Sequence, residues 1–477
     1  MSLTPSAQYA VTARLEYPHE PGWIARIASV IAEQGGSINS IDLVHIHRGR
    51  SLRDYTIECP STDQETNMVD ALRHVDGVTV HSVSDDTFLM HLGGKLEIHS
   101  KVPLKTRADL SMAYTPGVAR VCTAIEREPQ SSFNLTIRKN CVAVISDGST
   151  VLGLGNIGGA AAMPVMEGKA ILFKEFGGVD AFPLCLDTQD PDQIVQFCQA
   201  VAPTFGGINL EDIAAPKCFD IEQRLTDLLD IPVFHDDQHG TAVVVLAGFI
   251  NALKLTDRSA GDVKLVVTGA GAAGMACTRA LWEFGVRNII VFDPKGPIHP
   301  DRDLAGNLAK QWLAENTNPD RYQGDVHGAM SGADMFVGVS GPDVLSRADI
   351  QAMNPNPIVF AMSNPNPEIM PEEIDGIPAL VATGRSDYPN QINNVLAFPG
   401  LFRGALDCRA ARIDAPMKHA AAQAIAGVIA EEELSVDYFI PSAFDRKVAQ
   451  RVAATVADAA RESGVARRMP KGMIDFD

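Results

Sequence analysis

Residues 263–274 read Val263-Lys264-Leu265-Val266-Val267-Thr268-Gly269-Ala270-Gly271-Ala272-Ala273-Gly274, a short apolar strand that runs directly into the pattern G-x-G-x-x-G. An alanine-rich stretch of helical character follows. In such a strand–turn–helix unit Gly269 permits the tight turn, Gly271 lets the backbone approach a pyrophosphate, and Gly274 lets helix and strand pack closely. Ala272 and Ala273 open the helix, whose free N–H groups and partial positive charge face the phosphates. We therefore predict a dinucleotide-binding domain of the doubly wound, Rossmann type.

The dinucleotide is predicted to be a nicotinamide cofactor, with NAD favoured over NADP. Asp293 stands nineteen residues past Gly274, at the end of a second apolar run over residues 289–292. A carboxylate at this position accepts hydrogen bonds from the ribose hydroxyls and repels a 2′-phosphate. Lys295 lies two residues further on and could meet such a phosphate, so NADP stays open as the cofactor.

The composition predicts a large soluble protein. With 477 residues the chain is expected to hold about three domains of roughly 150 residues each. A net charge of −19 disfavours nucleic acid and anionic membranes as partners. The eight cysteines show no C-x-x-C spacing, which is typical of reduced thiols in a cytosolic protein. No signal peptide is visible, and the longest apolar stretch, residues 241–253, is too short to span a bilayer. We expect a cytoplasmic location.

Residues 1–88 are predicted to form a small domain of their own. Strand-like segments at 9–15, 38–47, 52–58 and 78–83 alternate with helical segments at 23–31 and 64–73, which is the β-α-β-β-α-β order of ferredoxin-like folds. Pro21-Gly22 opens the first helix and Gly35-Gly36 ends it, and on these features the segment resembles an ACT domain. The resemblance implies either a sensor for an amino acid or another metabolite, or a pairing module without a ligand. It makes a homodimer or a dimer of dimers the expected assembly.

Residues 95–238 and 239–466 are predicted to form two further α/β domains, one for the substrate and one for the dinucleotide. Apolar runs at 142–145 and 181–185 read as strands of the first. Runs at 335–339, 358–362 and 380–382 read as further parallel strands of the second, which ends in an alanine-rich helical tail. A second G-x-G-x-x-G at residues 153–158 lacks an acidic residue at the end of a following strand. We interpret it as a segment that positions backbone near the active site.

Two acidic pairs are candidate metal ligands. Glu211-Asp212 follows an apolar run, and Asp236-Asp237 precedes a helix expected after Gly240. Mg²⁺ and Mn²⁺ take a few carboxylates and leave positions open for substrate oxygens. Each pair alone is better explained as a helix cap or a solvated turn. Both pairs beside a cofactor-binding unit favour a metal site.

Two further residues are candidates for proton transfer. Tyr114 stands on a predicted tight turn, and Lys169 stands in an otherwise apolar helical stretch. Burial in such a stretch is expected to lower the pKa of the lysine toward the range of a general base. Taken singly, a tyrosine is usually a packing residue and a lysine usually a surface charge.

Together these segments resemble the malic enzyme family in its short bacterial form. The matching blocks, in order, are A-Y-T-P-G-V-A from Ala113, V-L-G-L-G-N-I-G from Val151, M-E-G-K-A from Met166, N-L-E-D-I from Asn209, F-H-D-D-Q-H-G-T-A from Phe234, the glycine-rich unit, M-S-N-P-N-P-E from Met362, F-P-G-L-F-R-G-A-L from Phe398, and Y-F-I-P from Tyr438. They cover about residues 95–465, so the N-terminal domain is an addition to the family core.

The resemblance assigns a role to each candidate by its position. Tyr114 matches the family's general acid, Lys169 its general base, and Asp236 a carboxylate near that lysine. Glu211, Asp212 and Asp237 match the three metal ligands. Asn364 and Asn393 match residues that contact malate, and Asn364 also matches a residue that contacts the cofactor. Larger eukaryotic members carry an arginine for the substrate carboxylate just before L-G-L-G, where Val151 stands here. That contact must come from a residue that the sequence does not identify.

The implied activity is oxidative decarboxylation of L-malate to pyruvate and CO₂ with reduction of NAD, dependent on Mg²⁺ or Mn²⁺. Lys169 would take the C2 hydroxyl proton as hydride leaves for the nicotinamide, and Tyr114 would protonate C3 after CO₂ departs. A malolactic enzyme would use the same residues and release lactate, so this alternative stays open. An amino-acid dehydrogenase with an ACT domain needs no metal, and a catalytically silent sensor needs neither Tyr114 nor Lys169, so both fit the sequence less well.

Overall fold

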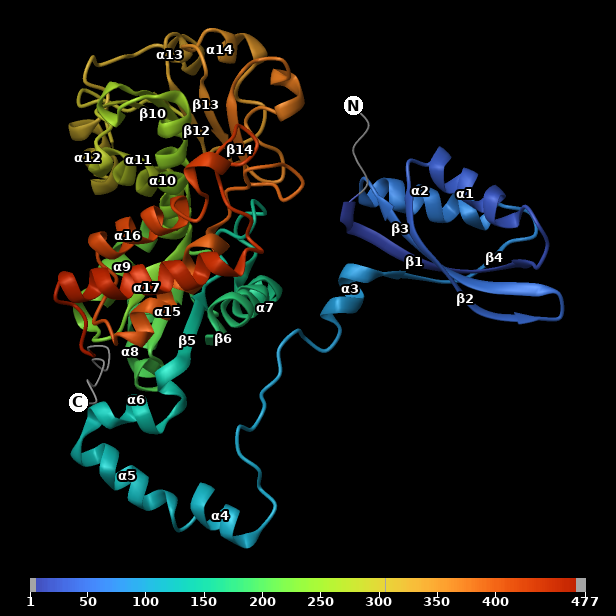
Figure 1. Cartoon of the computed structure of the whole chain (residues 1–477), viewed down its shortest axis with the longest axis horizontal. Helices are drawn as coiled ribbons and strands as arrows, with labels where there is room; N and C mark the ends of the chain where they lie inside the picture. Colours follow the sequence, from blue (N-terminus) through green and yellow to red (C-terminus); the bar gives the residue numbers. More distant parts are fainter. Residues whose placement is uncertain (1–5, 305, 469–477) are drawn as a thin grey trace. The chain divides into compact units, whose positions relative to one another are not determined.

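The first unit of the computed structural model, residues 1–97, is built on an antiparallel sheet; residues 6–304 and 306–468 of the chain are described (Figure 1). Its elements are β1 (Ser6–Pro18), α1 (Trp23–Glu33), β2 (Ser37–His47), β3 (Arg50–Cys59), α2 (Thr62–Arg73), β4 (Thr79–Asp85) and α3 (Asp86–His91). The strand order is β2-β3-β1-β4, and every neighbouring pair is antiparallel. The first six elements follow the predicted ferredoxin-like order. The short helix α3 was not expected.

Alternating side chains of β1 explain why the helices cover one face of this sheet. Val11, Ala13 and Leu15 are fully buried, and they pack with Ile27 and Ile31 of α1. Every second residue of a strand points to the same face, so this alternation specifies one covered and one open face.

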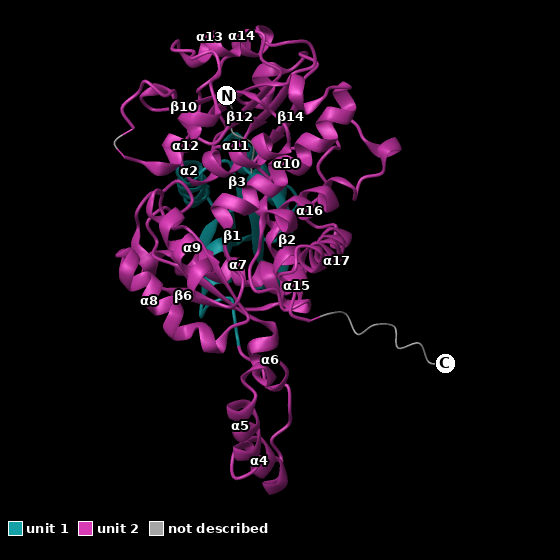
Figure 2. Ribbon diagram, turned by 90° about the vertical axis from the view of Figure 1, so that its left-hand side faces the viewer, with its two compact units in different colours: residues 1–97 teal, residues 98–477 magenta. Residues whose placement is uncertain are grey.

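Unit 2, residues 98–477, holds two parallel sheets (Figure 2). The first has the order β6-β5-β7-β8 and consists of β5 (Cys141–Ser146), β6 (Asp180–Cys185), β7 (Gly207–Leu210) and β8 (Val233–His235). Its crossover helices are α7 (Gly158–Gly177), α8 (Pro191–Val201) and α9 (Lys217–Leu228). All strands point the same way, so the segments that follow β5, β7 and β8 emerge at one edge of the sheet.

The second sheet has the order β11-β10-β9-β12-β13-β14. Its strands are β9 (Lys264–Thr268), β10 (Asn288–Asp293), β11 (Gly296–Pro297), β12 (Met335–Gly338), β13 (Ile358–Ala361) and β14 (Leu380–Thr383), parallel throughout except for β11. The chain leaves β9 for β10 on one side and returns to β12 on the other, which creates a switch point between β9 and β12. This confirms the predicted doubly wound, Rossmann-type sheet.

Helices surround and join the two sheets of unit 2. They are α4 (Arg107–Ala113), α5 (Val118–Arg127), α6 (Ser132–Leu135), α10 (Asp236–Thr256), α11 (Ala272–Phe284), α12 (Leu308–Asn316), α13 (Val326–Met330), α14 (Arg347–Gln351), α15 (Phe398–Asp407), α16 (Ala415–Ala426) and α17 (Arg446–Glu462). Val142 of the first sheet and Leu265 of the second belong to one continuous apolar core. The two sheets are therefore packed into a single body.

Helix α10 lies within this core. It begins at Asp236 and not, as predicted, after Gly240, so the domain boundary expected between residues 238 and 239 falls inside its first turn. By length and hydropathy it could cross a membrane, but 61% of its most apolar window is buried against the rest of unit 2. It is the core helix of a globular unit, and its first turn carries two aspartates.

Helices α4 and α5 form an arm that projects from the body of unit 2 in both views (Figures 1 and 2). Neither helix contains a buried residue. Met112 and Tyr114 at the end of α4 are each 69% exposed. The arm, residues 104–127, thus carries apolar side chains that nothing in the described part of the chain covers.

Candidate active site

Three carboxylates from neighbouring strand ends converge at one edge of the first sheet. Glu211 and Asp212 directly follow β7, and Asp237 lies in the first turn of α10, directly after β8. One carboxylate oxygen of each lies within 4.8 Å of the other two. Glu211 and Asp212 are buried, and Asp237 is half-buried. The sequence predicted these three residues as metal ligands, and the fold brings them together.

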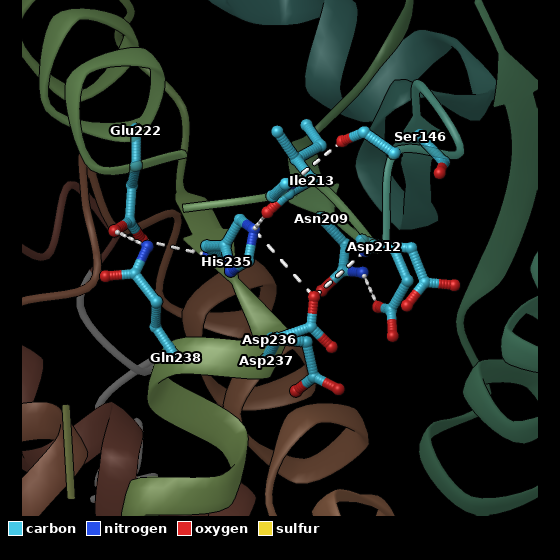
Figure 3. Close-up of polar contacts among 12 residues, drawn as sticks. Ser146, Asn209, Asp212, Ile213, Glu222, His235, Asp236, Asp237 and Gln238 are labelled. Carbon is cyan, nitrogen blue, oxygen red and sulfur yellow. Dashed lines mark hydrogen bonds and ion pairs between the residues drawn. The ribbon is translucent and has the colours of Figure 1, made fainter. Parts of the chain in front are cut away.

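The conformation of Asp212 turns it toward Asp237. Its φ of 54° lies in the left-handed region, which aspartate tolerates better than most residues. Its backbone N–H donates to Asp237 Oδ2 at 2.9 Å, the contact drawn in Figure 3. Asp212 Oδ2 is buried and has no hydrogen-bond partner in the described part of the chain. An acceptor buried without a donor is costly, so this set of oxygen donors fits Mg²⁺ or Mn²⁺.

Lys169 lies beside the carboxylates in the middle of α7, with 7% of its surface exposed. Its Nζ is 2.6 Å from Asp236 Oδ2 and 2.8 Å from Glu211 Oε1, and it sits 4.2 Å from the centre of the Phe398 ring. The expectation of a lowered pKa is wrong for this arrangement. Burial alone would lower the pKa of Lys169, but the adjacent Asp236 and Glu211 raise it above its ordinary value.

Burial and neighbouring negative charge raise the pKa values of the carboxylates as well. Burial, together with Asp237, raises the pKa of Asp212 to about 8. Burial also raises the pKa of Glu211 well above its ordinary value, against the attraction of Lys169. Asp236 follows the same pattern, because burial outweighs its ion pair with Lys169 and raises its pKa. A divalent cation at this point would remove the penalty by stabilising the ionised forms.

Hydrogen bonds behind the carboxylates fix the turn between β8 and α10 (Figure 3). The His235 N–H donates to Glu222 Oε1 at 2.9 Å, and the buried His235 ring lies 3.2 Å from the Ile213 carbonyl oxygen. Gly240 is required one turn later, because a Cβ there would lie 2.0 Å from Asp236 Oδ1. The sequence did not point to Glu222, because its role is to accept from the backbone of His235, thirteen residues further along the chain.

The loop between β5 and α7 is tied to the same edge. Ser149 Oγ donates to Asp147 Oδ1 at 2.6 Å and accepts from the Ala214 N–H at 2.9 Å. Lys217 pairs with Asp147 at 2.5 Å. The second glycine pattern lies in this loop, and a Cβ at Gly153 would lie 3.2 Å from the Asn364 carbonyl oxygen. That its backbone positions active-site groups stays a prediction.

The first glycine-rich turn lies at the switch point of the second sheet. Gly269 has a φ of 101°, and a Cβ there would lie 2.4 Å from the carbonyl oxygen of Val339, just past β12. A Cβ at Gly274 would lie 1.9 Å from the Gly269 carbonyl oxygen. Around Gly271 the space is open. Helix α11 starts at Ala272, so its N-terminal N–H groups face this open space.

Asp293 ends β10 beside the turn, but it is not a lone carboxylate. Arg302 Nη2 lies 2.5 Å from Asp293 Oδ1, and Lys310 Nζ lies 2.6 Å from Asp293 Oδ2. The Lys295 N–H donates to the same carboxylate at 2.8 Å. Burial would raise the pKa of Asp293, but these partners hold it below its ordinary value. Sequence analysis considered Lys295 and missed Arg302 and Lys310.

The remaining predicted residues lie in loops of the second half of unit 2 or outside the site. Asn364 is exposed after β13, and Asn393 Oδ1 accepts from the Val395 N–H at 3.0 Å. Val151 is fully buried, so its side chain offers nothing to a substrate. Tyr114 is the C-cap residue of α4 on the projecting arm, and Figure 1 shows this helix away from α7, the helix that carries Lys169. A tyrosine on a turn gives no sequence signal for this placement.

Comparison with known proteins places these features in one family. The family model for the malic enzyme N-terminal domain matches residues 93–226, and that for the malic enzyme NAD-binding domain matches residues 238–461. An NAD-dependent malic enzyme from Geobacillus stearothermophilus is 55% identical over 468 residues, 98% of both chains. A bifunctional malic/malolactic enzyme from Bacillus subtilis is 54% identical over 375 residues, which cover 78% of this chain and 92% of that protein.

Solved structures give the same result for the fold. The malic enzyme from Pyrococcus horikoshii superposes with a TM-score of 0.76 at 50% identity, covering 80% of this chain and 89% of that one. The NAD-dependent malic enzyme from Thermotoga maritima superposes with a TM-score of 0.76 at 47% identity, covering 78% of this chain and 99% of that one.

Proposed function

The chain belongs to the malic enzyme family, and we propose that Lys169, Tyr114 and the three clustered carboxylates carry out the family's reaction in it. That reaction is the oxidative decarboxylation of L-malate to pyruvate and CO₂. It reduces NAD(P) and requires a divalent metal ion. The observation that supports the assignment most directly is the buried Lys169 ammonium 2.8 Å from Glu211, a member of the carboxylate cluster. A base, its carboxylate partner and a metal site thereby share one edge of the sheet.

Glu211, Asp212 and Asp237 would hold the Mg²⁺ or Mn²⁺ ion. A bound ion of this kind polarises the C2 oxygen of the substrate and stabilises negative charge as the C4 carboxylate leaves. The unpartnered Asp212 Oδ2 supports the assignment, because a cation would satisfy it. Asn209 Nδ2 donates to Glu211 Oε2 at 2.7 Å and so orients that carboxylate.

Lys169 would accept the proton from the C2 hydroxyl at Nζ. It must first release its own proton, and Asp236 Oδ2 at 2.6 Å is the acceptor in direct contact with it. Asp236 Oδ1 is buried without a partner in the described residues, so this carboxyl group has room for the proton. We assign Asp236 the role of holding and returning the Lys169 proton. Phe398 covers the amine and keeps water away from it.

The cofactor and the substrate would bind across the edges of the two sheets. The turn residues Gly269, Gly271, Ala272, Ala273 and Gly274 would hold the pyrophosphate, and Asp293 the ribose. Asn364 would contact both cofactor and substrate. The Oδ1 atom of Asn393 is occupied by the Val395 N–H, which leaves its amide N–H groups for a malate oxygen.

Tyr114 would act in the active site of a second copy of the chain. The arm that carries it has no buried residue in α4 or α5, and Tyr114 itself is 69% exposed. Exposed apolar side chains on one projecting segment favour burial against a partner. An arm exchanged between two copies would cover these residues and place a phenol at each site, where it would protonate C3 of the enolic product. We therefore propose a dimer whose two sites are shared.

The N-terminal unit would assist this pairing. Strand β2 is an edge strand of its sheet, and Leu43, Val44 and Ile46 on it are exposed. An exposed apolar edge strand is a ready site for pairing with another chain. We propose that β2 pairs two copies, and that an amino acid or similar metabolite acting as an effector of this ACT-like unit would bind where the copies meet. The eight unpaired cysteines fit a reducing cytoplasm.

The decisive assay supplies L-malate and Mn²⁺ with NAD or NADP, and follows both nicotinamide reduction and the organic product. Pyruvate formed in equal amount to reduced cofactor is expected, and full activity without a divalent ion would contradict the proposal. The bifunctional malic/malolactic relative makes lactate a second candidate product. Malate converted to lactate without net cofactor reduction would assign the malolactic reaction instead.

A further inference from the structure

A cavity of about 510 Å³ lies beside the first turn of α10, on the side away from the carboxylate cluster. Residues of α9, α10, α11, α12 and α16 line it. Its walls combine apolar side chains such as Leu246, Ala280 and Trp312 with charged and polar ones, among them Glu222, Arg279 and Lys418. Its volume lies in the range of small-molecule sites.

One cation in this cavity lacks a counter-charge in direct contact. Lys418 Nζ lies 3.3 Å from His239 Nδ1, and His239 Nε2 lies 2.9 Å from Glu222 Oε2. The ring thus accepts from the lysine and donates to the carboxylate. Lys418 forms no ion pair within the described ranges, and burial lowers its pKa. Two ammonium N–H groups are therefore left for a ligand.

The other charged side chains of the cavity already have hydrogen-bond or ion-pair partners. Glu222 accepts from the His235 N–H, from Gln238 Nε2 at 3.2 Å and from His239. Arg279 pairs with Glu283 at 3.1 Å. The Lys418 ammonium keeps N–H donors free, so the cavity offers a bound anion a charged donor.

The cavity is separate from the dinucleotide crevice. The α11 residues that line it include Ala276, Arg279 and Ala280, whereas Gly274, Cys277 and Leu281 of the same helix are buried toward its sheet. The phosphate-binding turn at residues 269–273 contributes nothing to the lining. A ligand in this cavity would therefore not compete with NAD for the residues of the phosphate-binding turn.

The cavity shares a helical turn with the metal site. Asp236 and Asp237 face the carboxylate cluster, and the next two residues, Gln238 and His239, line the cavity. Figure 3 shows Glu222 and Gln238 on one side of His235, with Asp212 on the other. Any ligand that moves His239 or Glu222 therefore pulls on the backbone that holds Asp237.

We propose that this cavity is an effector site for a small anion with an apolar body, a carboxylate or phosphate whose charge binds Lys418, and that its occupation changes metal affinity at Asp237. Coupling of this kind is reciprocal, so Mn²⁺ must change the affinity for the effector by the same factor. Neither effector binding nor Mn²⁺ binding requires turnover, because each is a binding equilibrium that can be measured directly.

The probes are 1-naphthoate, 1-naphthyl phosphate and the neutral 1-naphthalenemethanol, titrated into the full chain by calorimetry. We expect one anionic probe per chain to bind saturably, and the ratio of the two anions reports whether a carboxylate or a phosphate is preferred. Lys418→Met should weaken anion binding by about ten-fold or more, the effect of losing one charge-assisted contact. The exposed Lys447→Met on α17 is the matched control and should bind as the wild type does.

A cavity-filling variant, Ala280→Trp, locates the site independently of Lys418 and should abolish binding. Equal affinity of wild type, Lys418→Met and Ala280→Trp would overturn the site, as would affinity for the neutral alcohol equal to that for the anions. The Kd for Mn²⁺ is then measured with and without saturating probe. An unchanged Kd would overturn the coupling, and a chain that lacked malate activity altogether would still give this readout.

Discussion

Lys310 Nζ lies 2.6 Å from Asp293 Oδ2, so the carboxylate proposed to bind the ribose is held by a cation seventeen residues further along the chain. Arg302 holds the other oxygen of the same carboxylate at 2.5 Å. An acidic residue at this position normally repels a 2′-phosphate. Here its negative charge is compensated by Arg302 and Lys310, so its repulsion of a phosphate is weakened.

We therefore predict that the chain accepts NADP, and that Lys310 and Arg302 determine its kcat/KM for NADP. Lys310→Met should lower kcat/KM for NADP by about ten-fold, the worth of one charge-assisted contact, and leave NAD nearly unchanged. Asp293→Asn should act in the opposite direction, because it frees both cations for the phosphate. Steady-state kinetics with each cofactor measure the ratio. Lys295→Met is the comparison: a loss of NADP use there, with none in Lys310→Met, would refute the assignment.

Removal of the buried amine tests the proposed base. Lys169→Met should reduce kcat by about 10²–10⁴-fold, the usual contribution of a general base. Mn²⁺ binding should persist, because the three carboxylates remain. Lys174→Met is the matched control on the same helix, since that side chain is 57% exposed and pairs with Asp180. Near-normal turnover in Lys169→Met with a folded circular dichroism spectrum would exclude Lys169 as the base.

Mixing two inactive variants tests whether the arm is exchanged. Tyr114→Phe removes the proton donor and Lys169→Met removes the base, so neither homodimer should turn over malate. If each site takes Tyr114 from the other copy, a mixed dimer contains one intact site. Refolding the two together at equal amounts should restore about a quarter of wild-type activity, from statistical pairing in a two-fold dimer. If Tyr114 acts in its own chain, the mixed dimer has no intact site and the mixture stays inactive.

The main strands could be predicted from sequence because their signals are local. The buried β5 is a continuous apolar run, and the turn at Gly269 carries its own glycine pattern. The adjacent acidic residues Glu211 and Asp212 could be recognised as candidate ligands because they directly follow a strand. Parallel strands then bring their carboxyl ends to one edge whatever the loop lengths are.

The electrostatics could not be predicted, because they depend on contacts between distant segments. The pKa of Lys169 rises because of Asp236 and Glu211, which are far along the chain from α7. Arg302 and Lys310, the cations that pair with Asp293, are separated from it in the sequence by β11 and a loop without regular spacing. The start of α10 at Asp236 was missed for a related reason. Two aspartates in a first turn suit a helix N-terminus, but they suit a solvated turn as well, and the packing of α10 decides between the two.

The cluster of Glu211, Asp212 and Asp237 should make stability depend on pH with a definite sign. Burial, with Asp237 nearby, raises the pKa of Asp212 from its ordinary 3.8 to about 8 in the folded chain. Between these values the folded state binds more protons than the unfolded state, so the free energy of unfolding must fall as pH rises. For one such proton the slope is up to roughly 1.4 kcal/mol per pH unit. In EDTA, the melting temperature should therefore decline from pH 5 to pH 8.

Mn²⁺ should reverse that decline, because it binds the ionised carboxylates and stabilises the folded state by RT ln(1 + [Mn²⁺]/Kd). The stabilisation should grow with pH, since the ion no longer competes with protons. Asp212→Asn should flatten the pH dependence in EDTA and abolish the response to Mn²⁺, whereas the exposed Asp227→Asn should behave as the wild type does. Differential scanning fluorimetry at a series of pH values provides the measurement. A melting temperature in EDTA that rose steadily from pH 5 to pH 8 would contradict the sign, and with it the view that these carboxylates are held together at a cost that the cation offsets.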